Sequence, residues 1–295
     1  MSRSMNRRTK WLLTASIVLV LFAIGIWINS STSPTSEAAP AAYTGEQLVK
    51  VHFIDVGQAD SIYIQLPDHN DILIDGGNVA DGSIVIDYLV AQGVDDIELM
   101  IATHPHEDHI GGLPAVLDAF VVERIIDSGK EYTSSIYRAF LEKALAEGAV
   151  YEPDNRQTLT FGNVALQVIT GNEIWSDIND YSVVCRLDTG EIEFMFMGDA
   201  ETPVESAIQG DITAEILKVG HHGSSSSSGQ DFLARVSPDI AIISVGDGNS
   251  YGHPTAATLS RLQSAGAMVY RTDLNGHIVV ATDGQTYSVN VSRTY

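Results

Sequence analysis

The chain has 295 residues, of which 44% are hydrophobic and 25 are glycine. That length and composition suit one large α/β domain or two small domains, with an ample apolar core. The formal net charge of −22 excludes a basic surface that would hold duplex nucleic acid or an anionic membrane by bulk electrostatics. It does not exclude phosphoester chemistry, because bound divalent cations would supply positive charge locally.

The first 47 residues differ from the rest of the chain. Residues 1–10 carry four cations and no acid, whereas residues 11–29 are uncharged and almost wholly apolar. At about 1.5 Å per residue, a helix over 11–29 is long enough to cross a bilayer core of roughly 30 Å. The basic flank predicts that residues 1–10 stay in the cytoplasm, so that the rest of the protein lies outside on a single-pass anchor in the cell membrane.

The alternative is a secreted protein, cleaved near Ala39-Pro40-Ala41. Residues 30–47 are mainly Ser, Thr, Pro and Ala, which predicts a flexible linker. The folded domain is therefore predicted over 48–295. Its single cysteine, Cys185, permits no internal disulfide, and a domain of this size needs none.

From residue 49 onward, strand and helix patterns alternate. Alternating or β-branched apolar runs predict strands at 49–56, 61–66, 71–74, 97–102, 158–169, 182–188, 191–197, 214–219, 239–245, 267–271, 277–281 and 285–291. Apolar residues at helical spacing predict helices at 83–92, 113–120, 137–147, 202–208, 230–236 and 255–265. The pattern occurs twice, which predicts two similar β-plus-α halves packed sheet to sheet with helices outside.

The segment from Thr103 to Gly112 carries the densest group of metal-ligand residue types. It reads Thr-His-Pro-His-Glu-Asp-His-Ile-Gly-Gly and follows a predicted apolar strand. A strand that leads into a tight loop would turn His104 and His106 the same way, with Asp108 and His109 one turn further on. Imidazole nitrogens with a carboxylate oxygen suit Zn²⁺, with Mn²⁺ as an alternative. The spacing therefore predicts a site for two divalent metal ions.

Other ligand types follow the ends of later predicted strands. Asp199 is expected to bridge two ions, since a two-metal site needs a shared anionic oxygen, although it could instead cap a helix. Of the adjacent pair His221 and His222, only one would point inward on an extended backbone. His221 is the preferred ligand, with His222 behind it or in contact with substrate. His253 is a ligand, a proton donor or a helix cap.

Several polar residues carry less specific patterns. The run 224–228 is all serine but lacks the Gly-x-Ser-x-Gly turn of a serine nucleophile, which favours a flexible loop. His52, His69 and His277 stand singly and are expected to be structural. Asp55 and Asp60 flank a glycine turn, a position where aspartate is common.

Together these residues resemble the metallo-β-lactamase superfamily, and within it the hydrolase domain of ComEC-type competence proteins and their stand-alone relatives. The matching segments are 53–61, 74–77, 103–112, 197–199, 217–224 and 251–254. The resemblance covers 49 to about 290 and implies a four-layer αββα sandwich. It implies that His104 and His106 hold one metal, Asp108 and His109 the other, that Asp199 bridges them and that His221 completes the set. It also implies that Asp75, with Asp55 and Asp60, lies behind the ligands and orients them.

Two departures from the family pattern matter. Superfamily members usually supply another histidine between the signature loop and the bridging aspartate, but residues 110–198 contain none. One metal would then be incompletely coordinated, or completed by His222 or His253. The family's Gly-Gln-Gly-Asp-Ser is Gly-Gln-Ala-Asp-Ser here, so Ala59 would be strained by about 1 kcal/mol if its φ were positive.

These observations predict an extracytoplasmic metal-dependent hydrolase that acts on a phosphodiester, either single-stranded nucleic acid or an envelope molecule. Asp108 would relay a proton, and His253 or His222 would protonate the leaving oxygen. One alternative is hydrolysis of an ester, lactone or thioester on the same fold. Another is a non-catalytic metal-binding component of an envelope or DNA-uptake complex.

Overall fold

The computed structural model describes residues 48–171 and 173–294. The predicted basic segment, membrane anchor and linker over 1–47 lie outside these residues. Within the described part of the chain, no helix combines the length and the apolar character needed to span a bilayer.

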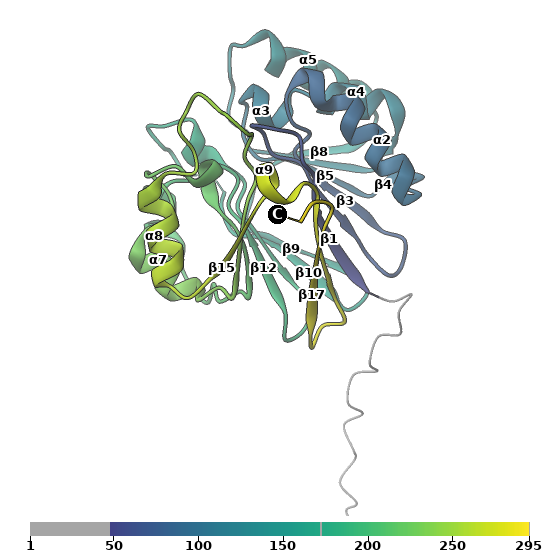
Figure 1. The fold of residues 1–295 in the computed structure, drawn as a ribbon. Helices are drawn as coiled ribbons and strands as arrows, with labels where there is room; N and C mark the ends of the chain where they lie inside the picture. The colour runs from purple at the N-terminus through teal and green to yellow at the C-terminus, as the bar shows by residue number, and fades with distance from the viewer. Residues whose placement is uncertain (1–47, 172, 295) are drawn as a thin grey trace, which may run out of the picture. The chain divides into compact units, whose positions relative to one another are not determined.

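Two large sheets lie face to face, and helices cover the outer face of each (Figure 1). One sheet has eight strands, in the order β17 (Tyr287–Val291), β16 (Ile278–Thr282), β1 (Val49–Phe53), β2 (Ile62–Gln65), β3 (Asp71–Ile74), β5 (Leu99–Ala102), β7 (Arg124–Asp127) and β8 (Val150–Pro153). The other has seven, in the order β15 (Met268–Arg271), β14 (Ile240–Ile243), β13 (Ile216–Lys218), β12 (Glu193–Phe196), β11 (Cys185–Asp188), β10 (Val164–Val168) and β9 (Gln157–Phe161). A small third sheet joins β4 (Asp96–Ile97) and β6 (Val121–Val122).

The helices pack on the outer faces of the two large sheets. The first sheet is covered by α2 (Gly82–Gln92), α4 (Leu113–Ala119) and α5 (Ser135–Ala146). The second is covered by α6 (Thr202–Ala207), α7 (Gln230–Val236) and α8 (Ala256–Ser264). Short helical turns are η1 (Val79–Asp81), α3 (Glu107–Ile110), η2 (Asn179–Tyr181), η3 (Gly220–Gly223) and α9 (Thr272–Asn275).

Three apolar layers hold the sandwich together. Alternation along the strands sends residues such as Val51 and Phe53 into the core between the sheets, where Phe53 meets Phe196 with ring centroids 6.4 Å apart. The outer faces pack against the helices through separate apolar clusters. The predicted αββα architecture is therefore confirmed.

Some predicted elements differ in detail. The strand predicted at 158–169 is a hairpin of β9 and β10, which turns at Gly162 with φ of 56°. The two halves are not separate in sequence, because β16 pairs with β1 and so places C-terminal strands in the first sheet. The strain considered for Ala59 does not arise, since the positive φ of that turn falls on Gly57. Strands β7 and β8 and helices α3 and α9 were not predicted.

Candidate metal centre

The candidate metal centre comprises seven side chains that gather at one edge of the sandwich: His104, His106, Asp108, His109, Asp199, His221 and His222. The first four come from the segment that follows β5, where α3 makes a single turn after His106. The other three follow β12 and β13. Because β3, β5 and β7 run parallel, as do β12, β13 and β14, their carboxyl ends deliver polar residues to the same edge.

The carboxylate of Asp199 divides the centre into two groups. Its Oδ1 lies 3.3 Å from His109 Nε2 and 3.6 Å from His222 Nε2. Asp108 Oδ2 completes this group at 3.3 Å from His222 Nε2. One ligand atom from each of these four residues fits within a span of 4.8 Å. This is the spacing of donors around a single metal ion.

The second group surrounds Asp199 Oδ2. His104 Nε2 lies 3.9 Å from this oxygen and His221 Nε2 lies 3.8 Å from it. His106 Nδ1 lies 3.0 Å from His104 Nε2. Asp199 therefore presents one oxygen to each group, an arrangement that would let its carboxylate bridge two ions.

Both histidines of the adjacent pair face Asp199. The expectation that only one would do so assumed an extended backbone, but His221 and His222 have φ of 49° and 50°. Left-handed backbone of this kind is costly for residues other than glycine and is found at functional sites. It brings His222 into the group with Asp108 and His109, and His221 into the group with His104.

Hydrogen bonds fix which imidazole nitrogen faces the centre. Asp75 accepts hydrogen bonds from the Thr103 backbone N–H at 2.8 Å, from the Thr103 hydroxyl at 2.7 Å and from His109 Nδ1 at 2.7 Å, which leaves His109 Nε2 to face Asp199. His222 Nδ1 donates to the Ser244 carbonyl at 2.9 Å, and His221 Nδ1 to Glu201 Oε1 at 2.8 Å. Such partners orient metal-binding imidazoles.

Charge compensation is strong inside the centre. Burial alone would raise the pKa of Asp199, but His109, His222 and His104 outweigh it and hold that pKa well below its usual value. Burial would lower the pKa of His109, but Asp199, Asp75 and Asp108 outweigh it and raise that pKa well above its usual value. A buried group in which Asp199 stays ionised and the His109 imidazole holds its proton strongly is also suited to a divalent cation.

The donor set fits a metal by a second criterion. Within the centre, three buried atoms have no hydrogen-bond partner among the described residues: His109 Nε2, His222 Nε2 and Asp199 Oδ1. They converge on one point, and leaving such atoms unpaired is costly unless a cation binds there. Imidazole nitrogen and carboxylate oxygen are donors for Zn²⁺ and Mn²⁺.

The centre opens into a cavity of about 300 Å³. Residues that line it beyond the centre include Gln58, Asn179, Tyr251 and His253. The ring of His253 lies 5.5 Å from that of His221, and the exposed ring of Tyr251 stacks on His253 at 5.9 Å. His253 is thus at the mouth of the cavity, apart from the two donor groups.

The three aspartates expected behind the ligands differ in position. Asp75 contacts His109 directly, and Asp60 lies 3.5 Å from His222 Nδ1. Asp55 lies elsewhere: its carboxylate pairs with Arg293, and its backbone N–H donates to His277. The structure does not bring Asp55 to the centre.

Sequence reasoning missed Glu201 and Lys218. The Lys218 ammonium group is fully buried and lies 2.6 Å from Asp60 Oδ2, so a buried ion pair stands directly behind His222. A lysine within the apolar run of β13 is the pattern that could have revealed it, because an unpaired lysine is almost never fully buried. Glu201 had no such indication.

Comparisons with known proteins agree with this geometry. The family model described as the metallo-beta-lactamase superfamily matches residues 54–247. ComE operon protein 3 of Bacillus subtilis (strain 168) is 31% identical over 251 residues, which cover 78% of this chain and 32% of that protein. Competence protein ComA of Neisseria gonorrhoeae is 31% identical over 228 residues, covering 75% of this chain and 30% of that protein. The chain thus spans about a third of the length of these curated relatives.

A solved structure shares the fold. The metallo-beta-lactamase fold protein YhfI from Bacillus subtilis superposes with a TM-score of 0.53 at 13% identity, covering 80% of this chain and 100% of that one. At this identity the likeness concerns the fold alone.

Proposed function

Because the chain belongs to the metallo-beta-lactamase superfamily, we propose that its candidate metal centre binds two divalent cations and hydrolyses phosphodiesters. The observation that carries the proposal is the position of the Asp199 carboxylate, because a separate group of imidazoles lies at each of its two oxygens. One cation would be held by His104, His106 and His221, and the other by Asp108, His109 and His222. In this arrangement His221 and His222 remove the need for a histidine between 110 and 198.

Bound Zn²⁺ or Mn²⁺ would supply Lewis acidity to a phosphoryl oxygen and lower the pKa of water. The protein's own groups then position and move protons. The side chain of Asp108 is 30% exposed and lines the cavity, so it can hydrogen-bond to water there and relay a proton. Burial would raise the pKa of Asp108, but His109 and His222 outweigh it, hold that pKa below the usual value and keep the carboxylate ionised. His222 is buried against Asp199 and Asp108, which leaves His253, at the mouth of the cavity, as the donor to the leaving oxygen.

We propose single-stranded nucleic acid as the substrate, in preference to an envelope phosphodiester. Tyr251, 70% exposed at the mouth of the cavity, offers a flat aromatic face on which a base can stack. The names of the curated relatives, which are competence and recombination proteins, favour the same substrate class. The formal charge of −22 argues against tight duplex binding.

The apolar segment 11–29 supports a further part of the proposal, namely that this domain is held outside the cytoplasm by a membrane anchor. Protease treatment of intact cells lacking an outer barrier should then digest the domain. Protection of the domain until the cells are lysed would contradict the proposal.

A carbonyl substrate, such as an ester or lactone, is the second candidate. The observation that favours it is the lining of the cavity, which contains no lysine or arginine among the described residues and so offers no side-chain cation to a phosphate.

The test uses the purified full chain. We expect about two metal ions per chain by elemental analysis, and turnover of bis(p-nitrophenyl) phosphate that depends on Zn²⁺ or Mn²⁺. His106→Asn should lower this turnover at least about 100-fold, whereas the matched variant of an exposed histidine, His69→Asn, should retain it. Turnover of an ester or lactone without turnover of the phosphodiester would select the second candidate. Full phosphodiester turnover in His106→Asn would contradict the assigned centre.

A further inference from the structure

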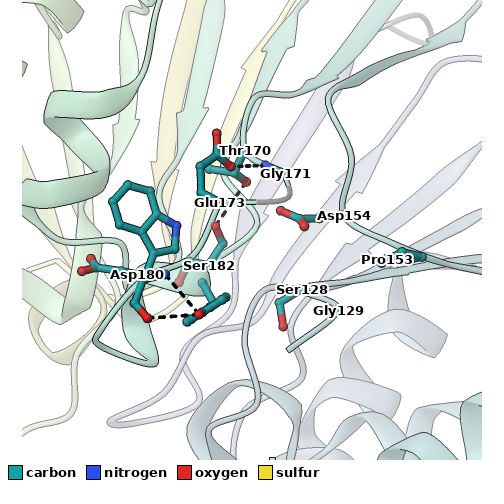
Figure 2. A pocket seen from close by; sticks show the side chains of 11 residues that line it. Ser128, Gly129, Pro153, Asp154, Thr170, Gly171, Glu173, Asp180 and Ser182 are labelled. Carbon is teal, nitrogen blue, oxygen red and sulfur yellow. Dashed lines mark hydrogen bonds between the residues drawn. The ribbon is translucent and has the colours of Figure 1, made fainter. Parts of the chain in front are cut away.

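Figure 2 shows a second cavity, of about 320 Å³. It lies at the same edge of the first sheet as the candidate metal centre. Strands β5, β7 and β8 run parallel, with Ala102 opposite Asp127 and Asp127 opposite Pro153. The residues that follow these strands are therefore neighbours. Two strand spacings, about 10 Å, separate the start of the metal-binding segment from the start of the segment that lines this cavity.

One segment forms a wall of both cavities. Asn179 lines the cavity of the metal centre, whereas Asp180 and Ser182 line the second cavity. The Ser182 hydroxyl lies 3.4 Å from His104 Nδ1 and accepts a hydrogen bond from the Asp199 backbone N–H at 3.0 Å. A ligand that reached from one cavity to the other would pass along this segment.

The side chain that defines the second cavity is Asp154. Only 7% of this residue is exposed, and its carboxylate extends across the cavity toward the wall that carries Thr170 and Ser182 (Figure 2). Burial raises the pKa of Asp154 to about 6, although the Thr170 hydroxyl and Arg156 oppose the increase. Arg156 itself is engaged by Glu173 and by the Gly171 carbonyl. A carboxylate offers about four acceptor positions, so Asp154 has unused capacity for N–H donors.

The remaining walls exclude anions and favour a flat ligand. Glu173 and Asp180 add negative character, and the Asp180 carboxylate is already used by the Glu201 backbone N–H at 3.0 Å. Trp175 and Tyr181 contribute aromatic surface, and the Lys130 ammonium group covers one face of the Tyr181 ring at 4.4 Å from its centroid. The Tyr181 hydroxyl accepts from the Trp175 backbone N–H and donates to the Trp175 carbonyl, which fixes the two residues against each other. An acceptor group, aromatic walls and a small volume together select a planar group that carries N–H donors.

We propose that the second cavity binds a nucleobase with an amino-bearing edge, guanine above all, of the strand whose phosphodiester occupies the candidate metal centre. This assignment rests on the proposed function, because it places the base and the scissile group in adjacent cavities. Guanine presents two adjacent N–H donors that match the two oxygens of Asp154, whereas thymine presents one. Unstacked bases are recognised in this way, by hydrogen bonds to their edge and by contact with aromatic side chains.

The first test measures binding of free nucleosides, which contain no phosphate, to the full chain by isothermal titration calorimetry. Guanosine should bind at least about tenfold more tightly than thymidine, because a bidentate contact discriminates between bases to that extent. Asp154→Asn should abolish the preference. The matched control is Asp118→Asn, an exposed aspartate on the helical face, which should keep the preference. Equal binding of guanosine by the wild-type protein and Asp154→Asn would overturn the proposal.

Two further measurements keep the outcome clear. Trp175→Leu removes aromatic surface and should weaken guanosine binding about fivefold or more, so it tests the cavity even if Asp154→Asn fails to fold. Hydrolysis of bis(p-nitrophenyl) phosphate by the wild-type protein tests the candidate metal centre separately, because this substrate has no base. Hydrolysis without any guanosine preference would overturn the nucleobase assignment and leave the proposed function intact. Guanosine preference without hydrolysis would support the cavity and overturn the proposed reaction.

Discussion

Two buried carboxylates at one edge of the sandwich behave in opposite ways. Asp199, in the candidate metal centre, is surrounded by imidazoles, and its pKa lies well below the usual value although burial opposes this. Asp154, in the second cavity, has no comparable set of partners, and burial raises its pKa to about 6. Burial is common to both positions, so the neighbours decide whether the acid keeps its charge. A compensated carboxylate suits a cation, whereas an uncompensated one suits a neutral ligand with N–H donors.

The largest effect on stability is expected from removing Lys218, the buried cation behind the candidate metal centre. Lys218 pairs with Asp60 at 2.6 Å, and both side chains are fully or almost fully buried. Lys218→Met would leave Asp60 unpaired beside His222, and breaking a buried ion pair from one side costs about 3–5 kcal/mol. We expect the free energy of unfolding, measured by urea titration with circular dichroism, to fall by that amount.

The control is the double variant Lys218→Met/Asp60→Asn, which removes both charges. Its free energy of unfolding should recover by at least about 1 kcal/mol relative to the single variant, because no uncompensated charge remains. A single variant that unfolds within about 0.5 kcal/mol of the wild-type protein would show that the ion pair does not govern stability here.

Removing the charge of Asp154, by contrast, should raise the free energy of unfolding. The folded-state pKa of about 6 lies above the usual 3.8, so between these values the folded protein binds more protons than the unfolded chain, and stability falls as pH rises through this window. Asp154→Asn avoids the cost of ionising the buried carboxyl. We expect it to raise the free energy of unfolding at pH 8 by about 1–3 kcal/mol and to have little effect at pH 4.

Denaturant titrations at pH 4, 6 and 8 measure this difference. Asp118→Asn, at an exposed position, should change the free energy of unfolding by less than about 0.5 kcal/mol at each pH. A destabilised Asp154→Asn protein at pH 8 would mean that the carboxylate is compensated after all, and that the contrast with Asp199 is wrong.

The difference between these regions also explains what could be predicted from sequence. The metal-ligand types of the centre are concentrated in the segment that follows β5 and at the ends of β12 and β13, so periodicity and residue type locate them. The inward turn of both His221 and His222 depends on positive φ at each, which side-chain chemistry does not reveal. Asp55 was placed behind the ligands through the family resemblance, but it pairs with Arg293, 238 positions away.

The second cavity could not be predicted, because its walls come from short and irregular segments. Strand β8 is four residues long, lies at the edge of its sheet and ends on Pro153. Such edge strands lack the clear alternation that marks a half-buried strand, and an edge is one of the few places in a sheet where proline is tolerated. Asp154 carries no motif of its own. Its significance comes from burial beside Thr170 and Trp175, which follow β10 in the opposite sheet.

The smallest expected effect concerns the exposed aromatic at the mouth of the centre. Tyr251 stacks on His253, and among the described residues no hydrogen bond or ion pair joins it to the seven residues of the centre. Tyr251→Ala should therefore raise KM for a single-stranded oligonucleotide about fivefold, since stacking of one base on an aromatic face contributes about 1–3 kcal/mol, and leave kcat within about twofold. Tyr251→Phe, which keeps the ring, should match the wild-type protein in steady-state kinetics. If Tyr251→Phe loses as much as Tyr251→Ala, the hydroxyl rather than the ring contacts the substrate. A fall in kcat with unchanged KM would instead place Tyr251 with His253 in the proton-transfer step. Tyr251 would then act in catalysis rather than in substrate binding alone.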